Sequence, residues 1–284
     1  MRRMGAAFGL AVLVATTAGA GMRYESTTRT VDEDGDAKQE FIVTSWVDGD
    51  KARIEFREAK GSPVPDDAYM LTTDGGRTMY LVDPEEKTYM QWDLDRMFQT
   101  LGDLQQASGG MVSMDFTDTS ADYQGSSPGG TILGYDTTKH AMKSAFTMQL
   151  KVFGMKQSTT IATETESWMT SELSAPGFGA WLRETPPKTG DPELDSMLDG
   201  IAAKLDGVVL KSVSRSVMTD SKGRETRSTS TTEVTSIEET DIEPSMFEIP
   251  PDYEKVEMPS MQEGDGSDED QPKGLGGLFK KIGG

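Results

Sequence analysis

The chain has 284 residues, with 28 Lys or Arg against 48 Asp or Glu, a formal net charge of −20, one histidine and no cysteine. This charge repels phosphate backbones, so we expect no nucleic-acid partner. The absence of cysteine excludes disulfides, thiolate catalysis, cysteine-based zinc sites and a lipid-modified N-terminal cysteine. We therefore expect no metal, no cofactor and a fold that packing stabilises.

Residues 1–20 have the pattern of a cleavable secretory signal peptide. Arg2 and Arg3 precede an uncharged apolar run at 5–15, which is too short to span a bilayer, and 18–20 read Ala-Gly-Ala, as at a cleavage site. Cleavage there would remove two Arg and no acid, leaving 26 basic against 48 acidic residues, a charge of −22. We expect a periplasmic or secreted protein.

Alternation with period two dominates the mature chain and predicts strands with one buried face. It is clearest at 51–57 and at 140–153, where apolar residues alternate with charged or polar ones. The predicted strands are 23–31, 39–47, 51–57, 69–73, 77–82, 87–92, 111–116, 131–135, 140–153, 157–173, 208–219 and 224–237. Short turn sequences between them, at 48–50, 74–76, 83–86, 136–139 and 220–223, are typical of antiparallel neighbours. The Ser-, Gly- and Pro-rich segment 120–130 is predicted to be a loop.

Helical spacing of apolar residues interrupts the strands in at least two places. The first predicted helix follows Asp93 as N-cap and has Leu94, Met97, Phe98, Leu101 and Leu104 on one face. The second follows Asp191 as N-cap, has Pro192 at its first position, and carries Leu194, Met197, Leu198, Ile201 and Leu205 as an apolar stripe. Both stripes are expected to pack on the inner face of the sheet.

The C-terminal part has a different composition. Residues 259–273 are acidic and Gly-rich, which predicts a disordered linker after a single domain at 21–258. In the tail, 274–284, Leu275, Leu278, Phe279 and Ile282 recur at helical spacing, with Lys280 and Lys281 off that face. Such a segment is typical of a short helix that forms on contact with a membrane surface or a protein partner.

Catalytic signals are weak. His140 has no serine or acid placed beside it by the sequence, and no nucleophile elbow, phosphate-binding loop or dinucleotide motif occurs. The methionines are more informative, because several of them, including Met90, Met142, Met169 and Met197, fall on predicted buried faces. Unbranched, polarisable Met side chains either fill a core or line a cavity for varied apolar ligands, and the sequence leaves both interpretations open.

Three segments resemble blocks of an uncharacterised family of exported bacterial proteins, a domain of unknown function. They are YLVDPEEKTYMQWD (80–93), ILGYDTTKHAMK (132–143) and MFEIPPDYEKVEM (246–258). That family is similar in architecture to the LolA/LolB/LppX group of outer-membrane lipoprotein carriers. The resemblance implies an α+β, mostly antiparallel fold: a strongly curved sheet or unclosed β-barrel with two or three helices on its concave face.

These observations favour a non-catalytic exported binding protein that holds a lipid or another hydrophobic small molecule between sheet and helices. The predicted cavity residues are Ile54, Phe56, Met97, Phe98, Phe146, Met148, Leu150, Val152, Leu198 and Ile201. The first alternative is an envelope structural or interaction protein recruited through the tail at Leu275, Leu278, Phe279, Lys280, Lys281 and Ile282. The second is a hydrolase that uses two carboxylates, for which no motif is present.

Overall fold

The computed structural model describes residues 21–60, 67–93, 95–96, 109, 111–152, 155–173, 186, 188–205 and 207–256. The predicted signal peptide, the linker and the tail lie outside these ranges, as does most of the first predicted helix. The strands are β1 (Gly21–Asp32), β2 (Ala37–Asp48), β3 (Lys51–Lys60), β4 (Tyr69–Thr72), β5 (Met79–Asp83), β6 (Thr88–Trp92), β7 (Val112–Ile132), β8 (Tyr135–Val152), β9 (Met155–Thr170), β10 (Val208–Asp220), β11 (Glu225–Thr240) and β12 (Glu254–Val256). The helices are α2 (Pro192–Ala202) and the short 3₁₀ helix η1 (Pro244–Phe247).

All these strands form one sheet of twelve in the order β12-β6-β5-β4-β3-β2-β1-β11-β10-β9-β8-β7. The sheet consists of two meanders, β1 to β6 and β7 to β11, in which each strand pairs with its neighbour in sequence. Antiparallel pairing of β1 with β11 joins the meanders, with Gly21 opposite Thr240. The three residues of β12 then add in parallel to β6.

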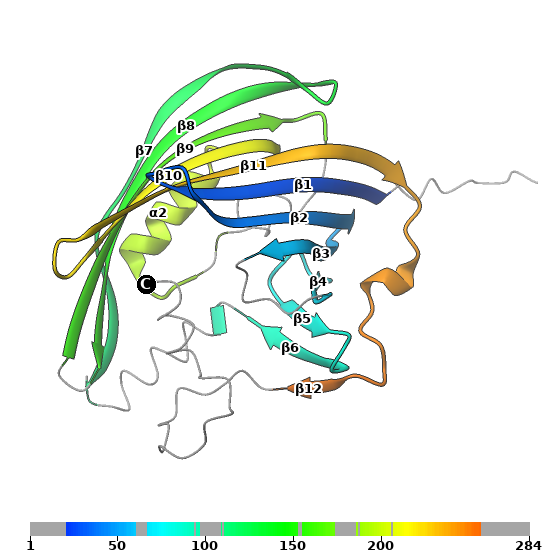
Figure 1. The fold of residues 1–284 in the computed structure, drawn as a ribbon, viewed down its shortest axis with the longest axis horizontal. Coiled ribbons are helices and arrows are strands. Elements are labelled where there is room, and N and C mark those ends of the chain that lie inside the picture. The colour runs from blue at the N-terminus through cyan, green and yellow to red at the C-terminus, as the bar shows by residue number, and fades with distance from the viewer. Residues whose placement is uncertain are drawn as a thin grey trace, which may run out of the picture.

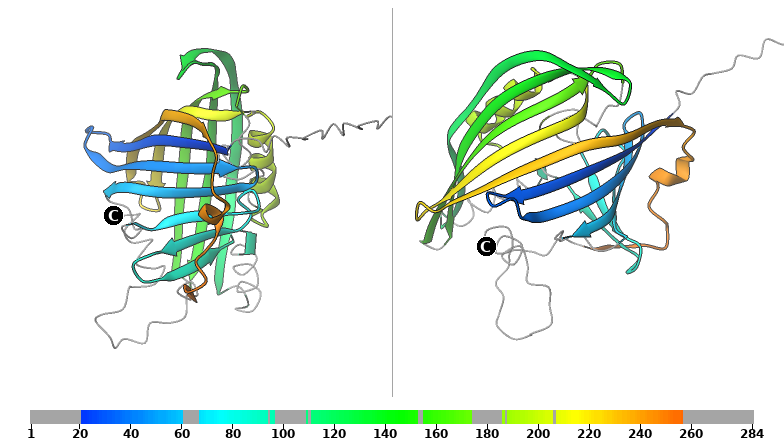
Figure 2. Two further views of the ribbon diagram at one scale, coloured as in Figure 1. Left: turned by 90° about the vertical axis from the view of Figure 1, so that its right-hand side faces the viewer. Right: turned by 45° about the horizontal axis from the view of Figure 1, so that its top comes forward.

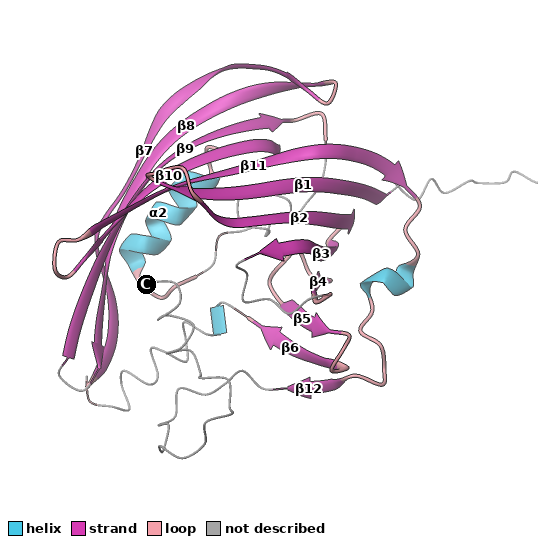
Figure 3. Ribbon diagram, viewed as in Figure 1, coloured by secondary structure: helices cyan, strands magenta, loops and turns pink. Residues whose placement is uncertain are grey.

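The sheet curves without closing, as the resemblance implies (Figures 1 and 3). It bends from β7 and β8, which arch over α2, round to β6 and β12 at the opposite side, so β7 and β12 remain the two edges (Figure 2). We call the face toward α2 the concave face. Within the described residues α2 is the one α-helix on this face, where the resemblance implied two or three; Asp95 and Arg96 are also helical, and the rest of that predicted helix lies outside the described residues.

Helix caps agree with the sequence. The Asp191 carboxylate accepts hydrogen bonds from the backbone N–H groups of Glu193 and Leu194, both at 3.0 Å, and Pro192 opens α2 as predicted. The Asp93 carboxylate likewise accepts from the N–H of Arg96 at 2.9 Å, the bond expected of the predicted N-cap. Neither α2 nor η1 has the length and apolar character needed to cross a bilayer, and the same holds for every helix in the described ranges.

The predicted hairpin turns are confirmed after β2, β4, β5 and β10, but the prediction for the hairpin of β7 and β8 was wrong. Residues 120–130 were predicted to be a loop and 136–139 a turn, whereas both lie in strands. The turn is instead Leu133-Gly134, where φ is +52° and +90°. Two consecutive positive φ angles characterise the type I′ turn, which matches strand twist. The Gly and Pro residues of β7 are accommodated by register shifts at Tyr123/Gly125 and at Pro128/Gly130.

The largest cluster of buried side chains packs around the seam between the meanders. It contains Met22, Tyr24, Val47, Ala52, Leu173, Val208, Leu210 and Val234. Tyr24 is 1% exposed and Leu210 fully buried. These residues come from β1, β2, β3, β10, β11 and the segment after β9, so the seam is fixed by apolar packing as well as by backbone pairing.

Burial of Tyr24 predicts a loss of stability in alkali. Desolvation, with a smaller contribution from Tyr135, raises the pKa of Tyr24 from 10.0 to about 12. Between these values the unfolded chain loses the proton and the folded chain keeps it, so the free energy of unfolding falls by up to about 1.4 kcal/mol per pH unit. Tyr24→Phe should reduce this slope. Urea unfolding of both proteins, below pH 10 and between pH 10 and 12, measures how the free energy of unfolding changes with pH. An equal slope in the wild type and Tyr24→Phe would contradict the raised pKa of Tyr24.

A second cluster lies on the convex face at the other end of the sheet. Tyr69, Leu71 and Val82 of β4 and β5 contact Phe247 of η1, with partly buried Ile249 and Tyr253 beside them. These last three belong to the third resemblance block. The Arg53 guanidinium, 3.7 Å from the centre of the Tyr69 ring, also donates to the Met246 carbonyl at 3.4 Å. The block therefore fastens the C-terminal segment, including β12, to the outside of the first meander.

Candidate functional site: a cavity between the helix and the long hairpin

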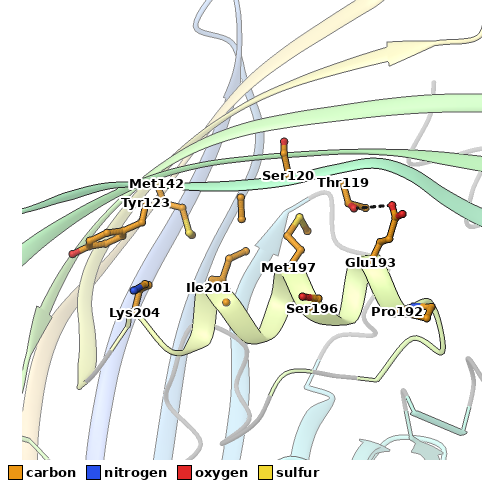
Figure 4. Close-up of a pocket in the computed structure, with 12 residues that line it drawn as sticks. Thr119, Ser120, Tyr123, Met142, Pro192, Glu193, Ser196, Met197, Ile201 and Lys204 are labelled. Carbon is orange, nitrogen blue, oxygen red and sulfur yellow. Dashed lines mark hydrogen bonds between the residues drawn. The ribbon is translucent and has the colours of Figure 1, made fainter.

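A cavity of about 880 Å³ lies between α2 and the hairpin of β7 and β8 (Figure 4). This is within the range of roughly 300 to 1,000 Å³ that is usual for small-molecule sites. It is lined by Thr119, Ser120, Ala121 and Tyr123 of β7, Met142 of β8, and Pro192, Glu193, Ser196, Met197, Gly200, Ile201 and Lys204 of α2 and its C-terminal turn.

A bulge in β7 shapes the strand side of the cavity. The register with β8 shifts between Thr117 and Ser120, and Asp118 within the shift has φ of +54°. In a regular strand successive side chains point to opposite faces. Alternation resumes after the bulge: the Thr119 side chain points toward Glu193 of α2, whereas Ser120, the cross-strand partner of Ala145, points away from the helix (Figure 4).

Two faces of α2 have different roles. Leu194, Leu198 and Ile201 are buried at spacings of four and three residues and anchor the helix. The adjacent face, with Met197 and Gly200, lines the cavity, and Ile201 at the border of the two faces contributes to both. Gly200 has no atom within 4 Å of the position that a Cβ would occupy, so its missing side chain adds to the open space.

The cavity has an apolar middle and polar ends. Met142, Met197 and Ile201 form the middle, whereas Glu193 and Lys204 lie toward opposite ends of the helix (Figure 4). The Thr119 hydroxyl donates to the Glu193 carboxylate at 3.5 Å. Such a lining suits an amphiphilic molecule, because flexible thioethers adapt to an apolar chain while exposed polar groups remain near water.

His140, for which the sequence offered no partner, contacts Tyr123. The Tyr123 hydroxyl and His140 Nδ1 form a hydrogen bond of 2.9 Å. Tyr123 lines the cavity. His140 precedes Met142 by two residues in β8, so both point to the same face and the Tyr123–His140 pair lies beside the cavity. The pairing orients the Tyr123 ring at this end of the cavity.

The structure brings some of the predicted cavity residues to one face but few of them to the cavity. Cross-strand partners point to the same side of a sheet, so the register from β3 to β8 shows which side chains share a face. It places five predicted residues on the concave face: Ile54, Phe56, Phe146, Met148 and Leu150. Ile54 is buried with Val43 and Met79, and Phe56 and Phe146 make edge-to-face contacts with Phe41 and Phe116, respectively.

Of the ten predicted residues, Ile201 lines the cavity, and Leu198 is buried on the anchoring face of α2. Met97 and Phe98 lie outside the described residues. Val152 ends β8, but its side chain is outside the described part. A ligand-binding role for these residues stays a prediction.

Sequence reasoning missed the β7 side of the cavity because 120–130 resembles a loop. The available signal was the length of the neighbouring amphipathic strand. A long β8 needs hydrogen-bonding partners along both sides, and a strand ending at 116 would leave Met142 and its neighbours unpaired on one side. Met142 and Met197 were, by contrast, correctly expected on inward faces, and both line the cavity.

Among solved structures the chain is similar to a DUF1329 family protein from Desulfovibrio piger, with a TM-score of 0.31 and 9% identity, covering 82% of this chain and 91% of the other. No curated protein matches it. Residues 27–253 match DUF4412, a domain of unknown function, and include most of the three blocks noted in the sequence. The chain therefore belongs to the DUF4412 family.

Proposed function

We propose that this protein is an exported, non-catalytic binding protein that holds an amphiphilic ligand in the cavity between α2 and the β7–β8 hairpin. The cavity carries the proposal, because its size and its mixed lining fit such a molecule. Export is supported by the signal-peptide pattern of residues 1–20. The implied similarity to lipoprotein carriers agrees with a passive role in which an apolar chain is shielded from water.

Binding would be driven by removal of apolar surface from water, which is worth about 25 cal/mol per Å². A chain placed along α2 would contact Met142, Met197 and Ile201 on both walls. Because α2 meets β7 in this region, small movements of the helix would adjust the width of the cavity to different chains.

The test is native mass spectrometry of protein purified from an exporting host, followed by titration with a fluorescent fatty acid. The wild type is expected to retain an amphiphile and to bind the probe. Met197→Trp places a large ring in the cavity and should weaken binding at least about tenfold, because the bulk cannot be accommodated beside Met142. Absence of any co-purified amphiphile, together with no probe binding, would refute the proposal.

Met155→Trp is the matched control, because Met155 is 70% exposed and is not among the cavity residues. It should bind the probe like the wild type, and an equal loss in both variants would point to a general effect of the added ring. Recruitment through the tail at 274–284 remains the alternative prediction. It is tested by deleting the tail and measuring membrane or partner association.

A further inference from the structure

The middle of the concave face is lined by hydroxyl groups. Two rows of cross-strand partners run across it: Thr165, Ser214, Ser230 and Thr30 in one, and Thr163, Ser216 and Ser228 in the next, which ends at Asp32 on β1. We call six of these residues the hydroxyl band: Thr30, Thr163, Thr165, Ser214, Ser216 and Ser230. It crosses β9, β10, β11 and β1, a width of about 14 Å at the usual spacing between strands.

The hydroxyl band continues directly from the cavity. Thr165 is the cross-strand partner of Met142, and Thr163 is the partner of Ser144, which in turn faces Ala121. Met142 and Ala121 line the cavity. Since cross-strand partners point to the same side of a sheet, the band lies on the concave face next to the cavity.

The opposite face of the same strands is charged. Glu164 and Glu166 alternate with the threonines of β9 and form ion pairs with Lys143 and Arg215. The strands are thus polar on both faces here, whereas a sheet that packs on a hydrophobic core has one apolar face. The band residues are half-buried, so this part of the concave face is neither packed core nor fully exposed surface.

The six residues of the band can donate and accept hydrogen bonds and carry no charge, and the Asp32 carboxylate that ends the second row is already paired with Lys38 at 2.7 Å. Its members pair across strands, Thr163 with Ser216 at 3.1 Å, Thr165 with Ser214 at 3.2 Å and Thr30 with Ser230 at 3.2 Å. Each pair contains two hydroxyl hydrogens and uses one between its members, so it can donate the other to a ligand oxygen. Ester carbonyls and hydroxyls suit such donors, whereas an ionised head group would require a paired charge.

We propose that the ligand is an uncharged amphiphile with a hydroxylated, ester-bearing head group, of the glycerol ester class. Its chain lies in the cavity and its head group lies over the hydroxyl band. This inference rests on the proposed function and adds the class of ligand. The competing arrangement places an ionised head group at Lys204, the cation at the end of the cavity.

Monooleoylglycerol and ionised oleic acid are suitable probes, because they have the same chain and differ in the head group. The full-length protein should bind the glycerol ester about tenfold more tightly, as expected for one or two additional hydrogen bonds. Thr163→Val with Thr165→Val keeps the side-chain shape and should remove this preference. Ser214→Ala with Ser216→Ala removes the partner hydroxyls, and it replaces the first variant if circular dichroism shows that the first is misfolded.

A matched control is present on the opposite face of β9 and its neighbour β8. Thr147 and Thr160 form an equivalent cross-strand pair at 2.9 Å on the convex side, so Thr147→Val with Thr160→Val should leave both affinities unchanged. Equal binding of the two probes, with no effect of the band variants, would overturn the inference and leave the proposed function standing. If oleic acid bound more tightly than the glycerol ester, and Lys204→Met abolished that preference, the inference would likewise be overturned and the proposed function would stand. Binding of neither probe would overturn both.

Discussion

Gly207→Ala is expected to destabilise the protein by about 2 to 5 kcal/mol, combining the cost of left-handed backbone with that of overpacking. Gly207 precedes β10 and has φ of +102°, and a Cβ there would lie 2.3 Å from the Thr170 carbonyl oxygen. Thr170 is the last residue of β9 and is the cross-strand partner of Val208. Its carbonyl oxygen therefore cannot move away without disturbing the pairing of β9 with β10. The affected contact lies beside the largest buried cluster.

The same substitution at Gly200 should have the opposite sign. Gly200 is inside α2 and no atom lies within 4 Å of a Cβ added there, so alanine should stabilise the helix by up to about 1 kcal/mol. Urea unfolding of both variants, followed by circular dichroism, measures the difference. A shift of the same sign in the two variants, or a Gly207→Ala variant with wild-type stability, would contradict the backbone argument.

Phe247→Ala is expected to lower the free energy of unfolding by about 3 to 5 kcal/mol, as is usual for a buried phenylalanine. Phe247 is 4% exposed and packs on Tyr69, Leu71 and Val82. It joins the C-terminal segment to the first meander, and β12 follows it closely along the chain. Its loss should therefore release β12 from β6 in addition to leaving a cavity.

Hydrogen exchange separates these two effects. In Phe247→Ala the amides of β6 and β12 should exchange faster than those of β9 and β10, and urea unfolding gives the overall loss. Ser245→Ala changes an exposed residue of the same 3₁₀ helix and should leave both measurements within about 0.5 kcal/mol of the wild type. Uniform acceleration of exchange across the whole sheet would show that Phe247 supports the entire fold and has no local fastening role.

Most of the fold was predictable because its signals are local. Alternation located most of the strands, and turns such as Asp83 to Glu86 were recognisable because the Asp83 carboxylate accepts from the N–H groups of Glu85 and Glu86. The N-caps at Asp93 and Asp191 are of the same kind. Parallel pairing of β12 with β6 was not predicted, because a three-residue strand has too few residues for a pattern and its position depends on Phe247.

The site was less predictable because it depends on register. Alternation correctly assigned Phe146 and Met148 to the inward face, but which part of that face adjoins α2 is decided by distant pairing. The bulge around Asp118 is an irregularity that no period reveals. The hydroxyl band was also hidden, since Thr and Ser in strands such as β9 and β11 are individually ordinary and acquire meaning only when four strands are aligned.

The pairing of β1 with β11 has a consequence for how the chain folds. Each meander consists of neighbours in sequence and can form soon after its own residues collapse, but the strand at 21–32 must wait for residues 225–240 before its second edge is covered. Such non-local pairing slows folding, to milliseconds or seconds in comparable β proteins. Until the seam forms, two long strands expose unpaired backbone that another chain can pair with. The central strand of the finished sheet is therefore the point at which the folding chain is most exposed to aggregation.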